Sequence, residues 1–335
     1  MVAILTAATM ITTLFMGCAQ TENGATTQND AENVIITETG EIIEQPSTVQ
    51  TEETPDAAEA TPEVVTVSPE SLVEPEQEQV IGEEDQTAPT GNEMQLVFLG
   101  DSLFDNSRDG TGIPYLTSVA CEADVYNLAI GGTSATLEQG ESESFDSWTS
   151  RSLVGVVNAI LGNISTDIFE GTRCKEILDN QDIDFSQTDY FIIEYGVNDF
   201  FRGVSQSNPD KNFDIYTYTG ALRYAISNLR SLAPDATIVL CGPCYAQFFN
   251  GTQFIGDGNS LNNGMGTLFD YKGTCQYISN EQQTLFLDAY MDLGIDSYTA
   301  EEYLLDGVHL TEAGRALYAD KLSRIILGNE ETKNN

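Results

Sequence analysis

The chain has 335 residues, with 53 acidic and 13 basic side chains and a formal net charge of −40 at pH 7. A surface this acidic repels nucleic acids and polyanionic polymers, which excludes them as partners and favours neutral or cationic substrates. The single histidine and the absence of a Cys/His cluster with zinc spacing argue against a dedicated metal site.

The first 18 residues are typical of an export signal. An apolar stretch from Val2 to Met16 is too short for a comfortable membrane span and resembles the core of a secretory signal. It ends in Gly17-Cys18, and a small residue directly before a cysteine resembles the bacterial lipoprotein signal, whose cleavage leaves Cys18 as the lipid-modified N-terminus. Phe15-Met16 and the lack of Lys or Arg before the apolar run depart from that pattern. A plain cleaved signal, giving a secreted protein, and an uncleaved anchor are therefore alternatives.

Residues 19–93 have the composition of a linker. They contain no Lys, Arg, Phe, Trp or Tyr, while Glu, Thr, Gln and Pro recur. Such a segment cannot bury enough apolar surface to offset its ordering entropy, so we expect a disordered acidic stalk. With Cys18 lipidated, the lipid would tether the protein to the bacterial cell surface, and the stalk would hold the folded part away from the membrane.

From residue 94 to 335, short apolar runs alternate with segments of helical periodicity. Strands are predicted at Met94–Leu99, Asp124–Leu128, Tyr190–Tyr195, Thr237–Cys241 and Thr284–Leu287. Helices are predicted at Ile113–Glu122, Ser152–Leu161, Tyr216–Leu232, Leu268–Gln283 and Glu312–Leu327, the last with Thr311 as its N-cap. This alternation predicts an α/β domain with a five-stranded parallel sheet covered by helices on both faces.

For two further features of the sequence, we favour a structural role over a functional one. Cys241-Gly242-Pro243-Cys244 matches a redox motif in letters, but it follows a strand, and a redox cysteine needs exposure at a helix N-terminus. The aromatic residues Trp148, Phe200, Phe201, Tyr245, Phe248 and Phe249 could line an acyl or sugar site, although aromatics more often pack in cores. The Asn- and Gly-rich segment Gln247–Gly266 is predicted to be a loop where substrate choice could lie.

Side chains suited to catalysis follow the predicted strands. Histidine is the usual general base near neutral pH, and His309 carries Asp306 three residues before it. In parallel sheets, ligands bind beyond the carboxyl ends of the strands, where these segments lie. The segments are Gly100-Asp101-Ser102-Leu103, Asn127-Leu128-Ala129-Ile130-Gly131-Gly132-Thr133-Ser134, Gly196-Val197-Asn198-Asp199 and Asp306-Gly307-Val308-His309.

These four segments, in this order, resemble the blocks of the SGNH hydrolase superfamily, also called GDSL esterases and lipases. The resemblance covers about residues 94–328 and implies a flavodoxin-like three-layer α/β/α fold. It implies Ser102 as the nucleophile, with His309 as its base and Asp306 orienting the histidine ring. The implied oxyanion hole consists of the backbone N–H groups of Ser102 and Gly132 and the side-chain amide of Asn198.

The resemblance implies a serine esterase without metal or cofactor, acting on a small-molecule or carbohydrate ester, with short acyl or acetyl groups favoured. The Gly-x-Ser-x-Gly hydrolase fold is disfavoured, because residue 104 is Phe and the acid is adjacent to the histidine. One alternative is an acyl- or acetyltransferase acting on surface polysaccharide, since the same acyl-enzyme serves both reactions. Another is a non-catalytic surface binding module, which would have no need of all five residues Ser102, Gly132, Asn198, Asp306 and His309.

Overall fold

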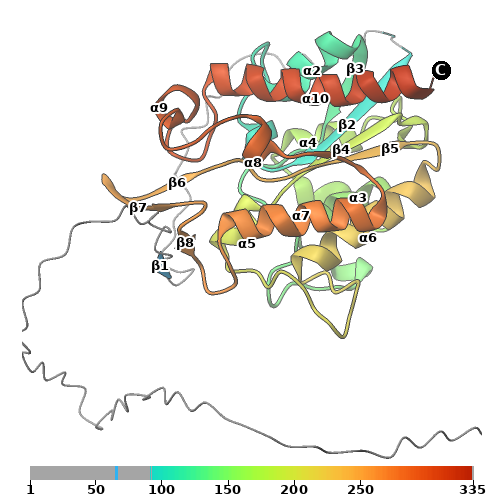
Figure 1. Ribbon diagram of the computed structural model, residues 1–335. Coiled ribbons are helices and arrows are strands. Elements are labelled where there is room, and N and C mark those ends of the chain that lie inside the picture. Colours follow the sequence, from blue (N-terminus) through green and yellow to red (C-terminus); the bar gives the residue numbers. More distant parts are fainter. Residues whose placement is uncertain (1–64, 67–90, 92, 334–335) are drawn as a thin grey trace, which may run out of the picture. The chain divides into compact units, whose positions relative to one another are not determined.

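The computed structural model of the protein describes residues 65–66, 91 and 93–333 (Figure 1). The predicted signal with Cys18, and the predicted stalk apart from Val65–Thr66, Gly91 and Glu93, lie outside the described residues. Within the described ranges, no helix combines the length and the apolar character that crossing a bilayer requires.

A five-stranded parallel sheet forms the centre of residues 93–333, as predicted. The strand order is β3-β2-β4-β5-β9, which is the flavodoxin-like order and confirms the expected fold class. Its middle strand is buried along its whole length, because helices cover both faces of the sheet. The strands are β2 (Met94–Gly100), β3 (Ala123–Asn127), β4 (Tyr190–Glu194), β5 (Thr237–Cys241) and β9 (Leu285–Leu287).

Two helical layers enclose the sheet. The helices α2 and α10 pack together on one face, while α3, α6 and α7 pack side by side on the other (Figure 1). The helices are α1 (Ser102–Asp105), α2 (Ile113–Cys121), α3 (Leu153–Ile160), α4 (Arg173–Leu178), α5 (Val197–Phe201), α6 (Tyr218–Leu232), α7 (Leu268–Gln282), α8 (Ala289–Asp292), α9 (Ala300–Tyr303) and α10 (Glu312–Lys333).

The last helix begins as predicted and ends later. Thr311 caps it by accepting a hydrogen bond from the Gly314 N–H at 3.2 Å. It continues past the predicted end at Leu327 because its final turns pack on Tyr190. The Asn329 amide donates to the Tyr190 hydroxyl at 2.6 Å, and the Lys333 ammonium lies 4.7 Å from the centre of the Tyr190 ring.

The segment Gln247–Gly266, predicted to be a loop, instead contains three strands. β6 (Gln247–Asn250) and β7 (Gln253–Asp257) form an antiparallel hairpin, and β8 (Leu261–Asn262) follows. The physical reason is the two-residue turn Gly251-Thr252 between the paired residues Asn250 and Gln253, where the glycine takes a φ of +60°. Inside the predicted stalk, β1 (Val65–Thr66) pairs in parallel with β8.

The topology places the site. Strand β2 lies between β3 and β4 in the sheet. The chain therefore runs from β2 to β3 on one side of it, and then crosses to β4 on the other side. Ligands bind at such switch points, beyond the carboxyl ends of the strands. Ser102 follows β2 and Asn198 follows β4, and the two strands pair as far as Gly100 and Glu194. The predicted nucleophile and the predicted amide donor therefore start from neighbouring strand ends.

Candidate active site

Three predicted residues meet in one hydrogen-bonded row. The His309 Nε2 atom lies 2.9 Å from the Ser102 Oγ, although the two residues are 207 positions apart. The His309 Nδ1 atom lies 2.7 Å from Asp306 Oδ2. Ser102 and His309 are each only 3% exposed. The row joins a hydroxyl, an imidazole and a carboxylate in the order that activates a serine for attack.

Asp306 is fixed by its own turn. Its Oδ1 atom accepts the backbone N–H of His309 at 2.8 Å and that of Val308 at 3.0 Å. Burial raises the pKa of the Asp306 carboxyl, but the hydrogen bonds from the ring and backbone of His309 outweigh it, and the net shift is downward. The carboxylate therefore stays ionised and holds the histidine ring with its Nε2 atom toward the serine.

Asp101 presents the nucleophile. Ser102 is the first residue of the short helix α1, and Asp101 caps this helix by accepting the Leu103 N–H at 3.1 Å. The same carboxylate accepts the Asn198 amide through its other oxygen, also at 3.1 Å. One fully buried side chain thus ties the serine turn to the predicted oxyanion donor.

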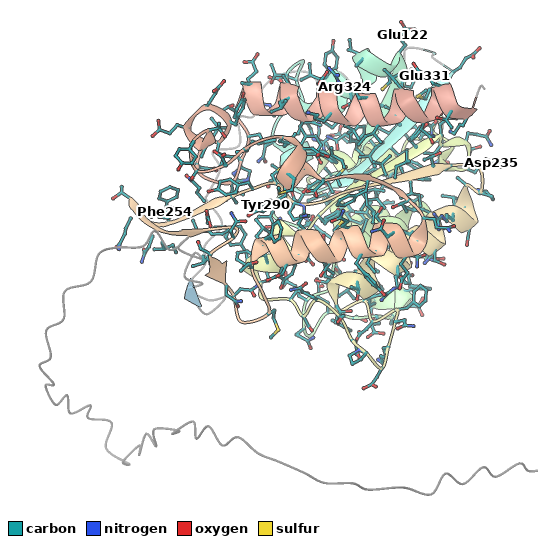
Figure 2. All side chains as sticks on the ribbon, viewed as in Figure 1. Glu122, Asp235, Phe254, Tyr290, Arg324 and Glu331 are labelled. Carbon is teal, nitrogen blue, oxygen red and sulfur yellow. The ribbon has the colours of Figure 1, made fainter. Side chains whose placement is uncertain are left out.

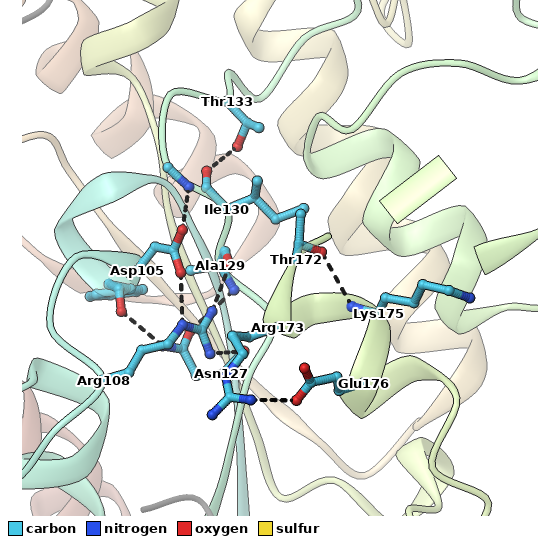
Figure 3. Close-up of polar contacts among 12 residues, drawn as sticks. Asp105, Arg108, Asn127, Ala129, Ile130, Thr133, Thr172, Arg173, Lys175 and Glu176 are labelled. Atoms are coloured by element: carbon cyan, nitrogen blue, oxygen red, sulfur yellow. Dashed lines mark hydrogen bonds and ion pairs between the residues drawn. The ribbon is translucent and has the colours of Figure 1, made fainter. Parts of the chain in front are cut away.

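The glycine pair after β3 has two different environments. The Gly131 N–H donates to Asp105 Oδ2 at 2.7 Å, so this group is engaged (Figure 3). Gly132 has a φ of +71°, a left-handed conformation that glycine adopts without strain. No hydrogen bond of its N–H occurs among the described residues. Of the two glycines, Gly132 is therefore the one whose N–H is not already engaged in the described part of the chain, and it stays the predicted donor.

Asn198 lies beside this loop with both amide hydrogens engaged. Its Nδ2 atom donates to Asp101 Oδ2 and, at 3.0 Å, to the carbonyl oxygen of Thr133. A substrate oxygen would therefore have to share or replace the Thr133 contact. The amide is almost fully buried, so its orientation is set by these two partners.

Two arginines that no sequence motif singles out, Arg108 and Arg202, contact the loop after β3 that carries Gly131 and Gly132. Arg108 pairs with Asp105 at 2.7 Å and donates to the carbonyl oxygens of Asn127 and Ala129 at 3.0 and 2.8 Å (Figure 3). Arg202 donates to the Gly132 carbonyl at 2.7 Å from the other side. Each of these contacts forms only in the folded loop, and no local sequence motif predicts it.

Asp199, inside the predicted Gly-x-Asn-Asp block, holds the segment after the glycine pair by hydrogen bonds. Its carboxylate accepts the Ala135 N–H at 3.0 Å, and the N–H and hydroxyl of Thr136 at 3.3 and 3.1 Å. Burial raises the pKa of Asp199, while these hydrogen bonds act in the opposite direction. The residue therefore connects α5, which carries Asn198, to the segment after the glycine pair.

The remaining sequence-based candidates divide between core and surface. Cys241 and Cys244 are buried free thiols, and burial raises the pKa of both, whereas a reactive thiol has a lowered pKa. Phe200 and Phe248 stack in the core at 5.2 Å, but Phe249 is exposed. The aromatic candidates that are buried in the core are Trp148, Phe200, Phe201, Tyr245 and Phe248.

No group of three or more His, Cys, Asp or Glu residues in the described part could hold a metal ion.

A family model described as GDSL-like lipase/acylhydrolase matches residues 98–317. The chain belongs to this family. Membership confirms the resemblance to SGNH hydrolases and identifies an ester-hydrolysing enzyme. The matched range of this GDSL-family chain includes Ser102, Asn198, Asp306 and His309. No curated protein sequence matches the chain.

Solved structures with some similarity to this GDSL-family protein include two from bacteria. A possible lipase from Chitinophaga pinensis is 17% identical with a TM-score of 0.50, and the match covers 71% of this chain and 99% of that one. A protein from Lactobacillus plantarum is 18% identical with a TM-score of 0.49, over 70% of this chain and 97% of that one. The first likeness supports the fold and carries nothing about the substrate.

Proposed function

We propose that the protein is a serine esterase that hydrolyses carboxylic esters through an acyl-Ser102 intermediate. The observation that carries this proposal is the row from Ser102 Oγ through the His309 ring to Asp306, with contacts of 2.9 and 2.7 Å. The Nε2 atom of His309 is within reach of the hydroxyl proton, which is the first requirement for a general base.

In the acylation step, Ser102 Oγ attacks the ester carbonyl carbon while His309 takes the hydroxyl proton. Asp306 stabilises the imidazolium that forms. The carbonyl oxygen becomes an oxyanion, which accepts hydrogen bonds from the N–H groups of Ser102 and Gly132 and from the Asn198 amide. His309 then returns the proton to the leaving alcohol. Water repeats the sequence to release the acid and restore Ser102.

We further propose short-chain esters on carbohydrate as substrates. Support comes from Phe249 and Phe254 on the β6–β7 hairpin, which are 42% and 51% exposed with ring centres 5.7 Å apart. The Gln247 N–H donates to the Gly307 carbonyl at 2.7 Å, which joins this hairpin to the turn that carries Asp306 and His309. Exposed aromatic faces close to a catalytic turn provide an apolar surface on which a sugar ring can pack.

For localisation, we propose attachment to the bacterial cell surface through lipidated Cys18, with residues 19–93 as the stalk. The apolar stretch before Gly17-Cys18 supports this proposal. Replacing Cys18 by Ala should move the protein from the membrane fraction to the soluble fraction. An unchanged membrane fraction would contradict lipidation and favour an uncleaved anchor.

The test of the chemistry is to trap the acyl-enzyme. Acid quenching during turnover of p-nitrophenyl acetate, followed by peptide mass spectrometry, should find an acetyl group on the peptide that contains Ser102. The His309→Ala variant should show none at the same time points, because its serine lacks a base. Acetyl groups on another residue, with Ser102 unmodified, would contradict the proposal. Product analysis with a sugar acceptor separates hydrolysis from acyl transfer.

A further inference from the structure

Glu194 is a buried acid directly beneath the nucleophile. It is the last residue of β4, is 0% exposed, and pairs in register with Gly100 at the end of β2. Among residues 93–333 it forms no ion pair with Lys, Arg or His, and both of its carboxyl oxygens lack a well-formed hydrogen bond. The backbone N–H of Asp101 lies close enough to act toward a lower Glu194 pKa, but burial outweighs it. A buried carboxylate left in that state would be costly, so the side chain requires an explanation.

The group that faces Glu194 is another carboxyl. The side chains of Glu194 and Asp101 lie within hydrogen-bonding reach of each other. Burial, and then the charge of Asp101, raise the pKa of Glu194 well above its usual range. Two adjacent buried carboxyls cannot both ionise, so the pair retains one proton. The other titratable groups around Glu194 are Asp199, Tyr195, Tyr218, Cys241, Cys244, Cys275 and Tyr318, and none of them supplies a positive charge.

The proton belongs on Glu194, because Asp101 already acts as an acceptor on both oxygens. Its Oδ1 atom takes the Leu103 N–H and its Oδ2 atom takes the Asn198 amide. Hydrogen bonds to the charged form favour ionisation of Asp101. An ionised carboxylate has room for a further donor, and a protonated Glu194 supplies one.

We propose that Glu194 is a positioning residue that keeps its proton and donates it in a hydrogen bond to Asp101, so that Asp101 can hold the Asn198 amide and the start of α1 around Ser102. The inference rests on the proposed function for its kinetic readout. Glu194 touches no substrate and acts only through Asp101.

The test compares the full chain with Glu194→Gln and Glu194→Leu, using p-nitrophenyl acetate. Gln retains a hydrogen-bond donor, so its kcat should stay within about threefold of the parent value. Leu removes the donor, and its kcat should fall by about tenfold or more with little change in KM, as for a loss felt in the transition state. Glu176→Gln, the same change at an exposed site on α4, is the control and should leave kcat unchanged.

A second readout needs no catalysis. A carboxyl whose pKa is raised in the folded state binds its proton more tightly there than in the unfolded chain. Its contribution to stability is therefore complete below the unfolded pKa and is lost as the pH rises toward the folded pKa. The free energy of unfolding of the parent should fall relative to that of Glu194→Gln as the pH rises above about 4.5, the ordinary value for Glu.

Three results would overturn the inference. They are a kcat for Glu194→Gln as low as that of Glu194→Leu, an undiminished kcat for Glu194→Leu, and a stability difference between the parent and Glu194→Gln that is constant with pH. If Glu194→Leu does not fold, the pH dependence of the free energy of unfolding of the parent and of Glu194→Gln still tests the inference. Failure of the proposed function would look different, since turnover would then persist in Ser102→Ala while the stability result stood.

Discussion

Each side chain in the Ser102–His309–Asp306 row has its position set by backbone as well as by its neighbour. Asp306 is held by two N–H groups of its own turn, and Ser102 by the cap that starts α1. Such fixed groups have no reorganisation cost at the moment of reaction, which is the basis of electrostatic preorganisation. The resting structure therefore already has the geometry that acylation requires.

Asn198→Ala should lower kcat by about 10²–10³-fold, because it removes an oxyanion donor. KM should change much less, since the donor acts on charge that develops only in the transition state. Steady-state kinetics with p-nitrophenyl acetate measure both constants. Asn228→Ala, on α6 and bonded to the Tyr224 carbonyl, is the control for an Asn-to-Ala change. Equal kcat values in the two variants would remove Asn198 from the mechanism.

The β6–β7 hairpin is the element most closely associated with the catalytic turn. Gly307 has a φ of +95°, and a Cβ there would meet the Gln247 carbonyl oxygen at 2.3 Å and the Phe249 ring at 3.0 Å. The hairpin therefore packs directly against the residue after Asp306. Figure 2 shows Phe254 toward the end of this hairpin, away from the sheet. Its exposed rings lie where the remote part of a large substrate could extend.

Replacing Phe249 and Phe254 together by Ala should raise KM for an acetylated oligosaccharide by about 30-fold, at roughly 1 kcal/mol for each aromatic contact. The KM for p-nitrophenyl acetate should not change, because this ester is too small to reach the hairpin. Tyr277→Ala, an exposed aromatic residue on α7, is the control and should change neither constant. Equal effects on both esters would indicate damage to the catalytic turn rather than loss of a sugar contact.

A bidentate ion pair joins α6 to α7. Arg223 donates to the two carboxylate oxygens of Glu281 at 2.7 and 3.0 Å. The hydrogen bond from Arg223 lowers the pKa of Glu281 from 4.5 to about 2. For an acid with a lowered pKa, the stabilisation is complete above the unfolded value and is lost as the pH falls through the folded value.

Urea unfolding of the parent and Glu281→Gln should therefore differ most above pH 4.5, and the difference should shrink as the pH falls toward about 2. Solvent screening limits the difference to about 1 kcal/mol. The exposed pair between Arg324 and Asp320 provides a comparison, in which Asp320→Asn should have a smaller effect. A difference between parent and Glu281→Gln that does not depend on pH would contradict the ion pair.

Across the molecule, the parts that could be predicted from the sequence are those with a local signal. Each central strand is a compact apolar run, and both faces of the sheet are covered, so all five strands were identifiable without their partners. Ser102, Asn198 and His309 belong to short blocks at the ends of strands or before the last helix, and their order alone indicated the family. The Gly251-Thr252 turn also carries a hairpin signal, a glycine at the first turn position, which the many polar residues around it obscure.

The contacts that could not be predicted join residues far apart in the chain. Glu194 looks like the polar end of a strand until the register places it beside Gly100 and Asp101. Arg202 acts on a carbonyl 70 positions away, and nothing in its neighbourhood distinguishes it from other surface arginines. The supporting groups of the site depend on strand order and register, which no local pattern specifies.

The most direct test of the central claim is p-nitrophenyl acetate hydrolysis by the parent protein, Ser102→Ala and His309→Ala, measured side by side. The serine esterase mechanism predicts turnover by the parent and a loss of about 10³-fold or more in each variant, because neither the nucleophile nor its base acts without the other. Equal rates in all three proteins would contradict it and would favour a binding module that has the fold without the chemistry.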